Sequence, residues 1–252
     1  MGKDYQLFIS FPRSYSNENA TTYPVLYVVD GRQHFELFKS AYRYMNYQNE
    51  LEDLIIVGIG SGNDYISWII NRTYEFNPYL DTTLEKNWDN RLGVPSGTTK
   101  LGGAAKFLEC IKTEIVPFIE KNYKANSDRG LWGMSYGGTF ASYSLANSSN
   151  FFYRYGIHSP DYLRENEKIM DQIIAQFERD ESRVNSPNKV YFSVGGLDLP
   201  DYENQLTKLC KTLESKNYKN TNWSWRVFEG ETHTSVVPGN ISRTITELYR
   251  KK

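Results

Sequence analysis

The stretch RGLWGMSYGG, from Arg129 to Gly138, contains a G-x-S-x-G motif centred on Ser135. This motif is typical of a sharp turn between a strand and a helix, which strains the serine backbone and exposes its Oγ above the sheet. Apolar residues precede it and small residues follow it, so we expect a short strand at 130–132 and a helix at 136–146. The glycines remove side chains that would collide with neighbouring elements. We therefore predict that Ser135 is a nucleophile.

Length and composition restrict the class of protein. The chain has 252 residues and a formal net charge of -1. It lacks an apolar run of about 18 residues, the length that crosses a bilayer. We therefore expect a single domain over 1–252, no nucleic-acid partner and no membrane span. No export signal is visible after Met1, so we expect a cytoplasmic protein, or a periplasmic or secreted one if a signal is removed. Cys110 and Cys210 lack the clustering of a disulfide framework and are expected to be buried thiols.

The rest of the chain alternates between strand and helix patterns. Apolar and polar side chains alternate over 5–11, which is typical of an antiparallel edge strand. Continuous apolar runs at 24–30 and 54–60 favour buried strands, and the helical period at 33–47 between them implies a parallel pair. Further strands are expected at 152–157, 189–194 and 223–228, and further helices at 102–123, 168–179, 203–216 and 236–249. This alternation predicts a doubly wound, mostly parallel α/β sheet.

The expected helix at 102–123 combines an apolar stripe with a proline. Pro117 lacks an amide proton, so we expect it to kink the helix. The residues predicted to form the buried stripe are Phe107, Leu108, Ile111, Ile115, Phe118 and Ile119.

Residues 61–101 show little helical or strand periodicity. Long segments of this kind inside compact domains are usually lids or binding loops, so we expect this one to cover or line the pocket. Aromatic and cationic side chains suit an aryl or anionic substrate, and we predict substrate contacts for Trp68, Arg72, Trp88 and Arg91. The alternative is a structural excursion, in which the aromatics pack on the core and Arg72 makes an internal ion pair.

A serine nucleophile needs a base to remove its proton, and the chain offers three histidines. On a turn of this type the partners follow in the order serine, acid, histidine, which excludes His34. His158 follows Ser135 too closely to leave room for an intervening strand that carries the acid. His233 lies in a Gly/Glu/Thr loop after the last strand, from which an imidazole reaches a strand-end serine. We therefore predict His233 as the base and a packing or pocket role for His158.

The acid must hold the imidazole in the correct tautomer and stabilise its positive charge. Asp198 ends an expected strand between Ser135 and His233, and we predict it as the acid. Asp201 and Glu203 follow closely and are the alternatives. The structural alternative for Asp198 is a turn or a helix cap.

An oxyanion hole needs two aimed N–H donors. The amide of Tyr136, the residue after the nucleophile, is expected to be one of them. The other is expected in the loop after the strand at 24–30, from the amide of Arg32 or else of Gly31. The sequence shows no paired His or Cys ligands at metal-site spacing and no Gly-rich phosphate loop, so we expect no metal and no cofactor.

Several segments occur together in an order typical of one family. They are YPVLYVVDG at 23–31, IVGI at 56–59, Arg72 with Pro78, EIVP at 114–117, GMSYGG at 133–138, GGLD at 195–198 and GETH at 230–233. With these segments the chain resembles the putative-esterase (esterase D-like) family of α/β hydrolases. That family includes enterochelin and salmochelin esterases, bacillibactin trilactone hydrolases, feruloyl esterases and mycolyltransferases.

The resemblance covers nearly the whole chain and implies an α/β-hydrolase fold that hydrolyses esters through an acyl-enzyme. It implies the nucleophile, acid, base and oxyanion amides at Ser135, Asp198, His233, Arg32 and Tyr136. The chain departs from the family where Ser159-Pro160-Asp161 replaces a Ser-Pro-Ser segment.

The sequence leaves the substrate open. We expect a siderophore trilactone or another bulky aromatic ester, with a carbohydrate acetyl or feruloyl ester, or acyl transfer, as the alternatives. A catalytically silent hydrolase fold used for binding is the non-enzymatic alternative. The intact Ser135, Asp198 and His233 at expected strand ends argue against it.

Overall fold

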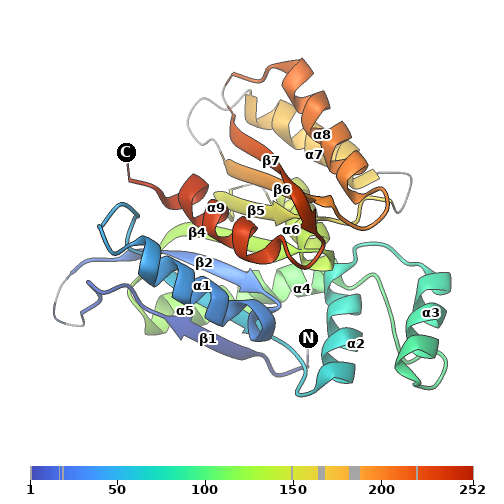
Figure 1. The fold of residues 1–252 in the computed structure, drawn as a ribbon. Coiled ribbons are helices and arrows are strands. Elements are labelled where there is room, and N and C mark those ends of the chain that lie inside the picture. The colour runs from blue at the N-terminus through green and yellow to red at the C-terminus, as the bar shows by residue number, and fades with distance from the viewer. Residues whose placement is uncertain are drawn as a thin grey trace.

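A mostly parallel sheet forms the centre of the protein in the computed structural model (Figure 1), which describes residues 2–16, 18, 20–148, 150–163, 168–181, 188–219 and 221–251. The described strands lie in the order β1-β3-β2-β4-β5-β6-β7, with β1 antiparallel to β3 and the other pairs parallel. The predicted sheet, including its antiparallel N-terminal edge strand, is confirmed. The strands are β1 (Gln6–Ser10), β2 (Tyr23–Val29), β3 (Ile55–Gly60), β4 (Ala125–Met134), β5 (Arg154–His158), β6 (Lys189–Leu197) and β7 (Asn222–Thr232).

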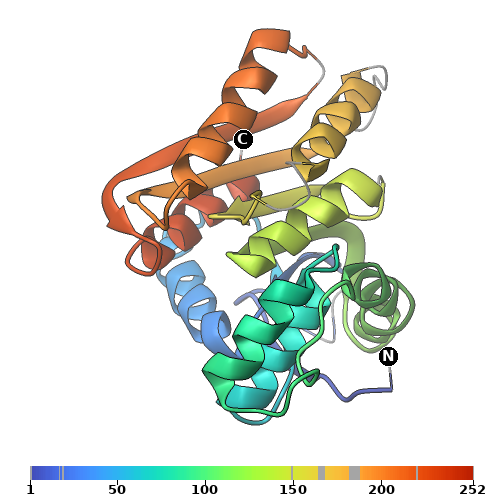
Figure 2. The ribbon, with the colours of Figure 1, turned by 90° about the vertical axis from the view of Figure 1, so that its right-hand side faces the viewer.

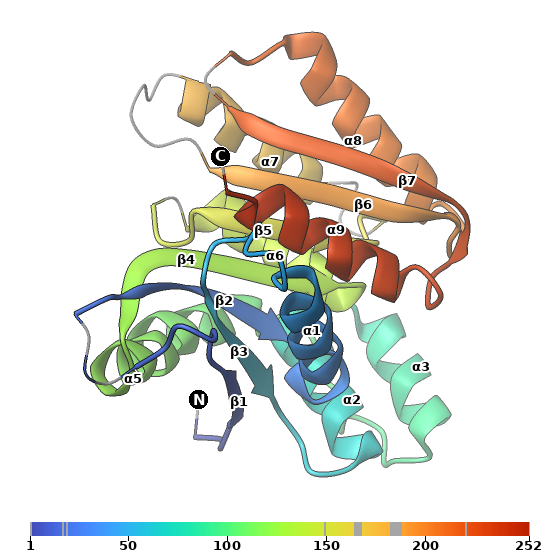
Figure 3. The same cartoon turned by 60° about the vertical axis from the view of Figure 1, so that its left-hand side comes forward.

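Helices cover both faces of the sheet, because the central strands are apolar on both sides. Along β2, Leu26 and Val28 belong to one buried cluster, whereas Val25 and Tyr27 belong to the other. The first cluster lies under α1 (Gly31–Met45) and α9 (Val237–Tyr249), which cross the near face of the sheet in Figure 3. The second lies under α4 (Ala104–Cys110), a π-helical turn η1 (Ile111–Ile115), α5 (Val116–Asn122), α6 (Tyr136–Asn147), α7 (Lys168–Glu181) and α8 (Tyr202–Lys216).

The segment 61–101, expected to be irregular, contains two helices, α2 (Tyr65–Phe76) and α3 (Thr82–Leu92), so that expectation was wrong. Each helix begins at an aspartate whose side chain accepts a backbone amide, Asp64 from Ser67 and Asp81 from Leu84. These caps satisfy orphan amide groups at the helix ends. Both helices stand beyond the carboxyl ends of the strands, in the foreground of Figure 2.

The expected helix at 102–123 is divided into α4, η1 and α5. The π-helical turn ends just before Pro117, which occupies the first turn of α5. The amide of Val116, just before the proline, donates to the carbonyl of Ile111 five residues back, so the widened turn lies where Pro117, which has no amide proton, interrupts the α-helical hydrogen bonds. The extra residue of a π turn also shifts the apolar stripe: Val116 and Ile119 are buried, whereas Phe118 is 48% exposed. The prediction that Phe118 is buried was therefore wrong.

The carboxyl edge of the sheet brings distant parts of the sequence together. β4, β6 and β7 end at Met134, Leu197 and Thr232, directly before the predicted nucleophile, acid and base. Cys110 and Cys210 are free and buried, as predicted. Among the described residues, no helix has both the length and the apolar character needed to cross a membrane.

Candidate active site

Ser135 occupies the turn between β4 and α6 and is half-buried. Its backbone angles are φ 58° and ψ -125°, a region in which a residue other than glycine is strained. Its amide donates a hydrogen bond of 3.0 Å to the carbonyl of His158 on the next strand, which holds the turn in place. A Cβ at Gly133 would lie 2.0 Å from the carbonyl oxygen of Gly137, so a larger residue does not fit there. The sharp turn predicted from the motif is present.

His233 and Asp198 are joined by a short hydrogen bond at the same edge. Nδ1 of His233 lies 2.6 Å from Oδ1 of Asp198. The Asp198 side chain is fully buried, whereas that of His233 is 20% exposed. The ring of Tyr202 meets the imidazole edge-on at 5.6 Å between ring centres and supports its orientation. This arrangement holds a proton on Nδ1 and leaves Nε2 as the atom able to accept one, as a serine base requires.

Ser159 is a contact of Asp198 that the sequence analysis noted only as a departure from the family pattern. It follows β5 with φ 42°, and its hydroxyl donates a hydrogen bond of 2.6 Å to Oδ2 of Asp198. Its position in the sequence could have indicated this contact, because Ser159 directly follows β5, the strand between β4 and β6. The Leu199 amide donates to Oδ1 at 2.7 Å, so both carboxylate oxygens are bonded.

The surroundings of Asp198 favour its ionised form. Burial opposes ionisation, but the hydrogen bonds from His233, Ser159 and the Leu199 amide outweigh it and lower the pKa of the carboxyl group. The alternative acids lie elsewhere. Asp201 is exposed at the N-cap of α8, and Glu203 is in the first turn of that helix.

The other two histidines pack against neighbouring side chains. His158 is fully buried, with Nδ1 2.6 Å from the Ser193 hydroxyl and Nε2 2.8 Å from the Thr244 hydroxyl. Burial lowers the pKa of His158 to about 3, so the ring is neutral. His34 packs edge-on against Trp132 at 4.9 Å, on the α1 side of the sheet. The predicted packing role of His158 agrees with these contacts.

Two helix N-termini supply the amides expected to form an oxyanion hole. Tyr136 is the first residue of α6, and Gly31 and Arg32 begin α1. Amides in a first helical turn have no intrahelical acceptor and attract negative charge. A Cβ at Gly31 would lie 2.5 Å from the backbone of Gly58, so α1 begins in direct contact with β3. The Arg32 side chain donates to Gln6 at 2.9 Å, so its guanidinium is held at β1.

A strand-turn-helix serine, a histidine–aspartate pair and two helix N-termini at one sheet edge are the parts that a serine esterase needs. A family model described as "Putative esterase" matches residues 1–235. The chain belongs to this family.

Two relatives of this chain are named as esterases. The chain is 25% identical to the ferri-bacillibactin esterase BesA of Bacillus subtilis over 96% of its own length and 84% of that protein's. It is also 25% identical to the apo-salmochelin esterase of Escherichia coli O6:H1 over 69% of its length. That second match spans about half of the relative, 52% of its chain.

Solved structures share the fold of this esterase-family chain. The BES protein from Bacillus cereus superposes with a TM-score of 0.85 at 28% identity, covering 99% of this chain and 92% of that one. The siderophore hydrolase EstA from Aspergillus nidulans superposes with a TM-score of 0.75 at 20% identity, covering 96% and 88%. At 20% identity the second likeness supports the fold alone.

In this member of the family, the side chains predicted to bind substrate from 61–101 fall into two groups. Trp68 and Arg72 on α2 both bond to Asp30: the indole Nε1 donates at 2.7 Å and the guanidinium Nη2 at 2.9 Å. The internal ion pair that the sequence offered as an alternative for Arg72 is therefore present. On α3, Trp88 donates to the Tyr136 hydroxyl at 3.3 Å, and the exposed Arg91 guanidinium lies 5.0 Å from the centre of the Trp88 ring. Contact of these four side chains with substrate stays a prediction.

Proposed function

We propose that the protein hydrolyses a carboxylic ester through an acyl-enzyme formed on Ser135. The observation that carries this proposal is the hydrogen bond between His233 and the buried Asp198. Asp198 also accepts from Ser159, whose neighbour His158 accepts the amide of Ser135 in its strained turn. His233 Nε2 takes the proton of the Ser135 hydroxyl as Oγ attacks the ester carbonyl carbon. Asp198 holds the proton on Nδ1 and stabilises the imidazolium that forms.

The tetrahedral intermediate carries its negative charge on the former carbonyl oxygen. The amides of Tyr136 and Arg32, or of Gly31 in place of Arg32, donate to this oxygen at the N-termini of α6 and α1. His233 then gives its proton to the departing alcohol oxygen, and the acyl group stays on Ser135. Water, activated by His233 in the same way, releases the acid and restores the serine.

For the substrate class, we propose an ester that carries aryl groups and anionic oxygens, of the kind found in siderophores. The similarity to proteins named as salmochelin and bacillibactin esterases supports this choice. Trp88 and Arg91 support it physically, because an indole face stacks on an aromatic ring and an exposed guanidinium pairs with anionic oxygens. Trp88 also contacts Tyr136, the residue after the nucleophile, so the acyl group would lie within reach of both side chains.

A panel of esters tests the proposal. We would compare kcat/KM for p-nitrophenyl acetate, a feruloyl sugar and catecholate trilactones with and without iron. A preference for the trilactones is the expected result, and a preference for the feruloyl sugar would move the substrate to carbohydrate esters. Fluorophosphonate should label the wild type and fail to label Ser135→Ala. Ester turnover by Ser135→Ala would contradict the mechanism itself.

A further inference from the structure

Asp30 is a buried carboxylate directly before the first residue of α1. It is the N-cap residue of that helix with φ 53°, and the Gly31 and Arg32 amides follow it directly. Its side chain is 3% exposed. A buried carboxylate is stable when its oxygens are bonded, and the donors here all come from α2. Oδ1 accepts from Trp68, and both oxygens accept from Arg72 at 2.9 to 3.2 Å.

The same guanidinium lies against the residue on the other side of the oxyanion hole. Its carbon Cζ is 5.3 Å from the ring centre of Tyr136 and 5.6 Å from that of Phe76. A Cβ at Gly137 would lie 3.7 Å from Oδ2 of Asp30, so the first turn of α6 packs directly on the carboxylate that Arg72 binds. The ion pair thus lies between the two helix N-termini.

We propose that Arg72 is a positioning residue that fixes the two halves of the oxyanion hole relative to each other. This inference rests on the proposed function. The planar guanidinium holds Asp30 through two parallel hydrogen bonds, and Asp30 fixes the start of α1 with its Gly31 and Arg32 amides. The face of the guanidinium holds the Tyr136 ring, and so the start of α6 with the second amide.

Positioning of this kind acts on the transition state more than on the bound substrate. A tetrahedral oxyanion needs both amides at hydrogen-bond distance at once, whereas the planar ground-state carbonyl has weaker demands. Loss of the Arg72 guanidinium should therefore lower kcat and leave KM nearly unchanged. A residue that contacts substrate directly would instead raise KM.

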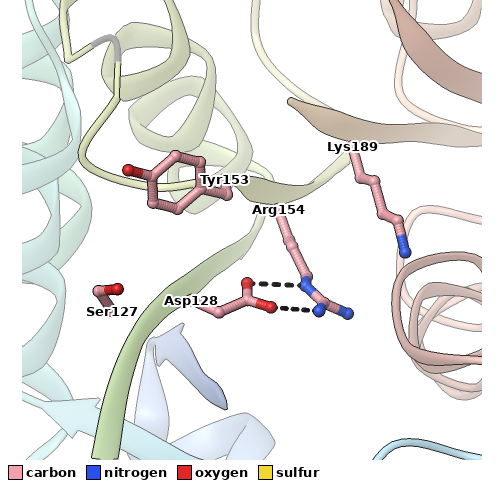
Figure 4. Close-up of a pocket in the computed structure, with 5 residues that line it drawn as sticks. All are labelled: Ser127, Asp128, Tyr153, Arg154 and Lys189. Carbon is pink, nitrogen blue, oxygen red and sulfur yellow. Dashed lines mark hydrogen bonds and ion pairs between the residues drawn. The ribbon is translucent and has the colours of Figure 1, made fainter. Parts of the chain in front are cut away.

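The test compares Arg72→Ala with Arg154→Ala as a matched control. The Arg154 side chain is 9% exposed and also pairs with carboxylates, those of Asp128 and Glu52, but at the amino edge of the sheet. Figure 4 shows its contact with Asp128. Both variants should lower the melting temperature, because Arg72→Ala leaves the buried Asp30 without its charged partner and Arg154→Ala does the same to the half-buried Asp128 and Glu52. With p-nitrophenyl acetate, Arg72→Ala should lower kcat by about 10²-fold at nearly constant KM, as expected for a displaced oxyanion donor. Arg154→Ala should keep the wild-type kcat at a temperature where both variants are folded.

A trifluoromethyl ketone gives an independent readout, because Ser135 Oγ adds to its carbonyl carbon, His233 takes the proton and the oxyanion occupies the hole. Its inhibition constant should rise in Arg72→Ala by about the same factor as kcat/KM falls. Guanidinium ion at millimolar concentration should restore part of kcat in Arg72→Ala and have no such effect on Arg154→Ala.

Arg72→Lys keeps a positive charge but lacks the planar guanidinium, and it replaces the alanine variant in the test if that variant does not fold. It should show the same loss of kcat at constant KM, to a smaller degree. The positioning role of Arg72 would be overturned if the folded variants kept the wild-type kcat, or if only their KM rose, while Ser135→Ala was inactive. Full activity of Ser135→Ala would instead overturn the proposed function, so the two failures are distinguishable.

Discussion

Ser159 and His233 bind opposite oxygens of one carboxylate, Oδ2 and Oδ1 of Asp198, each at 2.6 Å. The serine therefore restricts rotation of the carboxylate about its Cβ–Cγ bond, and this rotation sets the position of the imidazole. It also supplies a hydrogen bond that favours the ionised acid. Asp198 thus links Ser159 at the end of β5 to His233, which follows β7.

We expect Ser159→Ala to lower kcat by about ten-fold, because a hydrogen bond to a charged group contributes about 1.5–3 kcal/mol and part of this is recovered by water. The pKa of Asp198 should rise, since one bond to its ionised form is lost. An NMR titration of the Asp198 carboxyl carbon should therefore show a midpoint at higher pH than in the wild type. An unchanged titration with an unchanged kcat would contradict the role given to Ser159.

The assignment of the acid is tested by replacing each candidate carboxyl group. Asp198→Asn should keep the fold and lower kcat by about 10²- to 10⁴-fold, because the amide favours the wrong imidazole tautomer. Asp201→Asn and Glu203→Gln should have much smaller effects, since the carboxylate bonded to His233 is that of Asp198. A severe loss in Asp201→Asn would move the acid there, and near-normal rates in all three variants would indicate a Ser–His dyad.

The α3 side chains are expected to distinguish large substrates from small ones. Arg91→Ala should lower kcat/KM for a catecholate trilactone and leave p-nitrophenyl acetate unaffected, because the Arg91 guanidinium is exposed beside the Trp88 ring. Trp88→Ala should show the same selectivity with an additional small loss on both esters, since its indole bonds to Tyr136. Equal losses on both esters with a lower melting temperature would make these residues structural.

Burial of His158 is expected to make the free energy of unfolding depend on pH. Its pKa is lowered by burial from 6.5 to about 3, so between these pH values the unfolded chain binds a proton that the folded chain does not. Its contribution to stability is complete above pH 6.5 and decreases as the pH falls towards 3. Urea unfolding at pH 7, 6, 5 and 4 should therefore show a slope smaller by about 1.4 kcal/mol per pH unit in His158→Gln than in the wild type. Parallel slopes would exclude this contribution.

Much of the framework could be predicted because local patterns determine it. The apolar runs of β2 and β3 gave the parallel pair, and the alternation in β1 gave the antiparallel edge. The strained turn at Ser135 was predictable from its glycines, since a Cβ at Gly133 would lie 2.0 Å from the carbonyl oxygen of Gly137. The positions of Asp198 and His233 after β6 and β7 followed from the order of strands in such a sheet.

The rest depended on contacts that are distant in sequence. Helix α2 was missed because polar side chains lie on its buried side: Thr73 and Glu75 are buried, and Arg72 pairs with the buried Asp30. The apolar period of the helix is therefore interrupted. Phe118 was misplaced because a π turn is invisible to a 3.6-residue pattern. The bond from Ser159 to Asp198 joins residues on different strands, and no local rule pairs them.

The side chains of α2 and α3 have different proposed roles, positioning of the oxyanion hole and contact with substrate. This difference bears on how the substrate range of the protein could be changed. Exchange of the whole 61–101 segment with that of a relative would replace Arg72 and Trp68 together with the side chains proposed to contact substrate. The chimaera would then lose rate on every ester, whatever its new preference. A graft that begins after Phe76, the end of α2, keeps the ion pair with Asp30 and exchanges α3 alone. Libraries for altered substrate range are therefore best confined to 80–101.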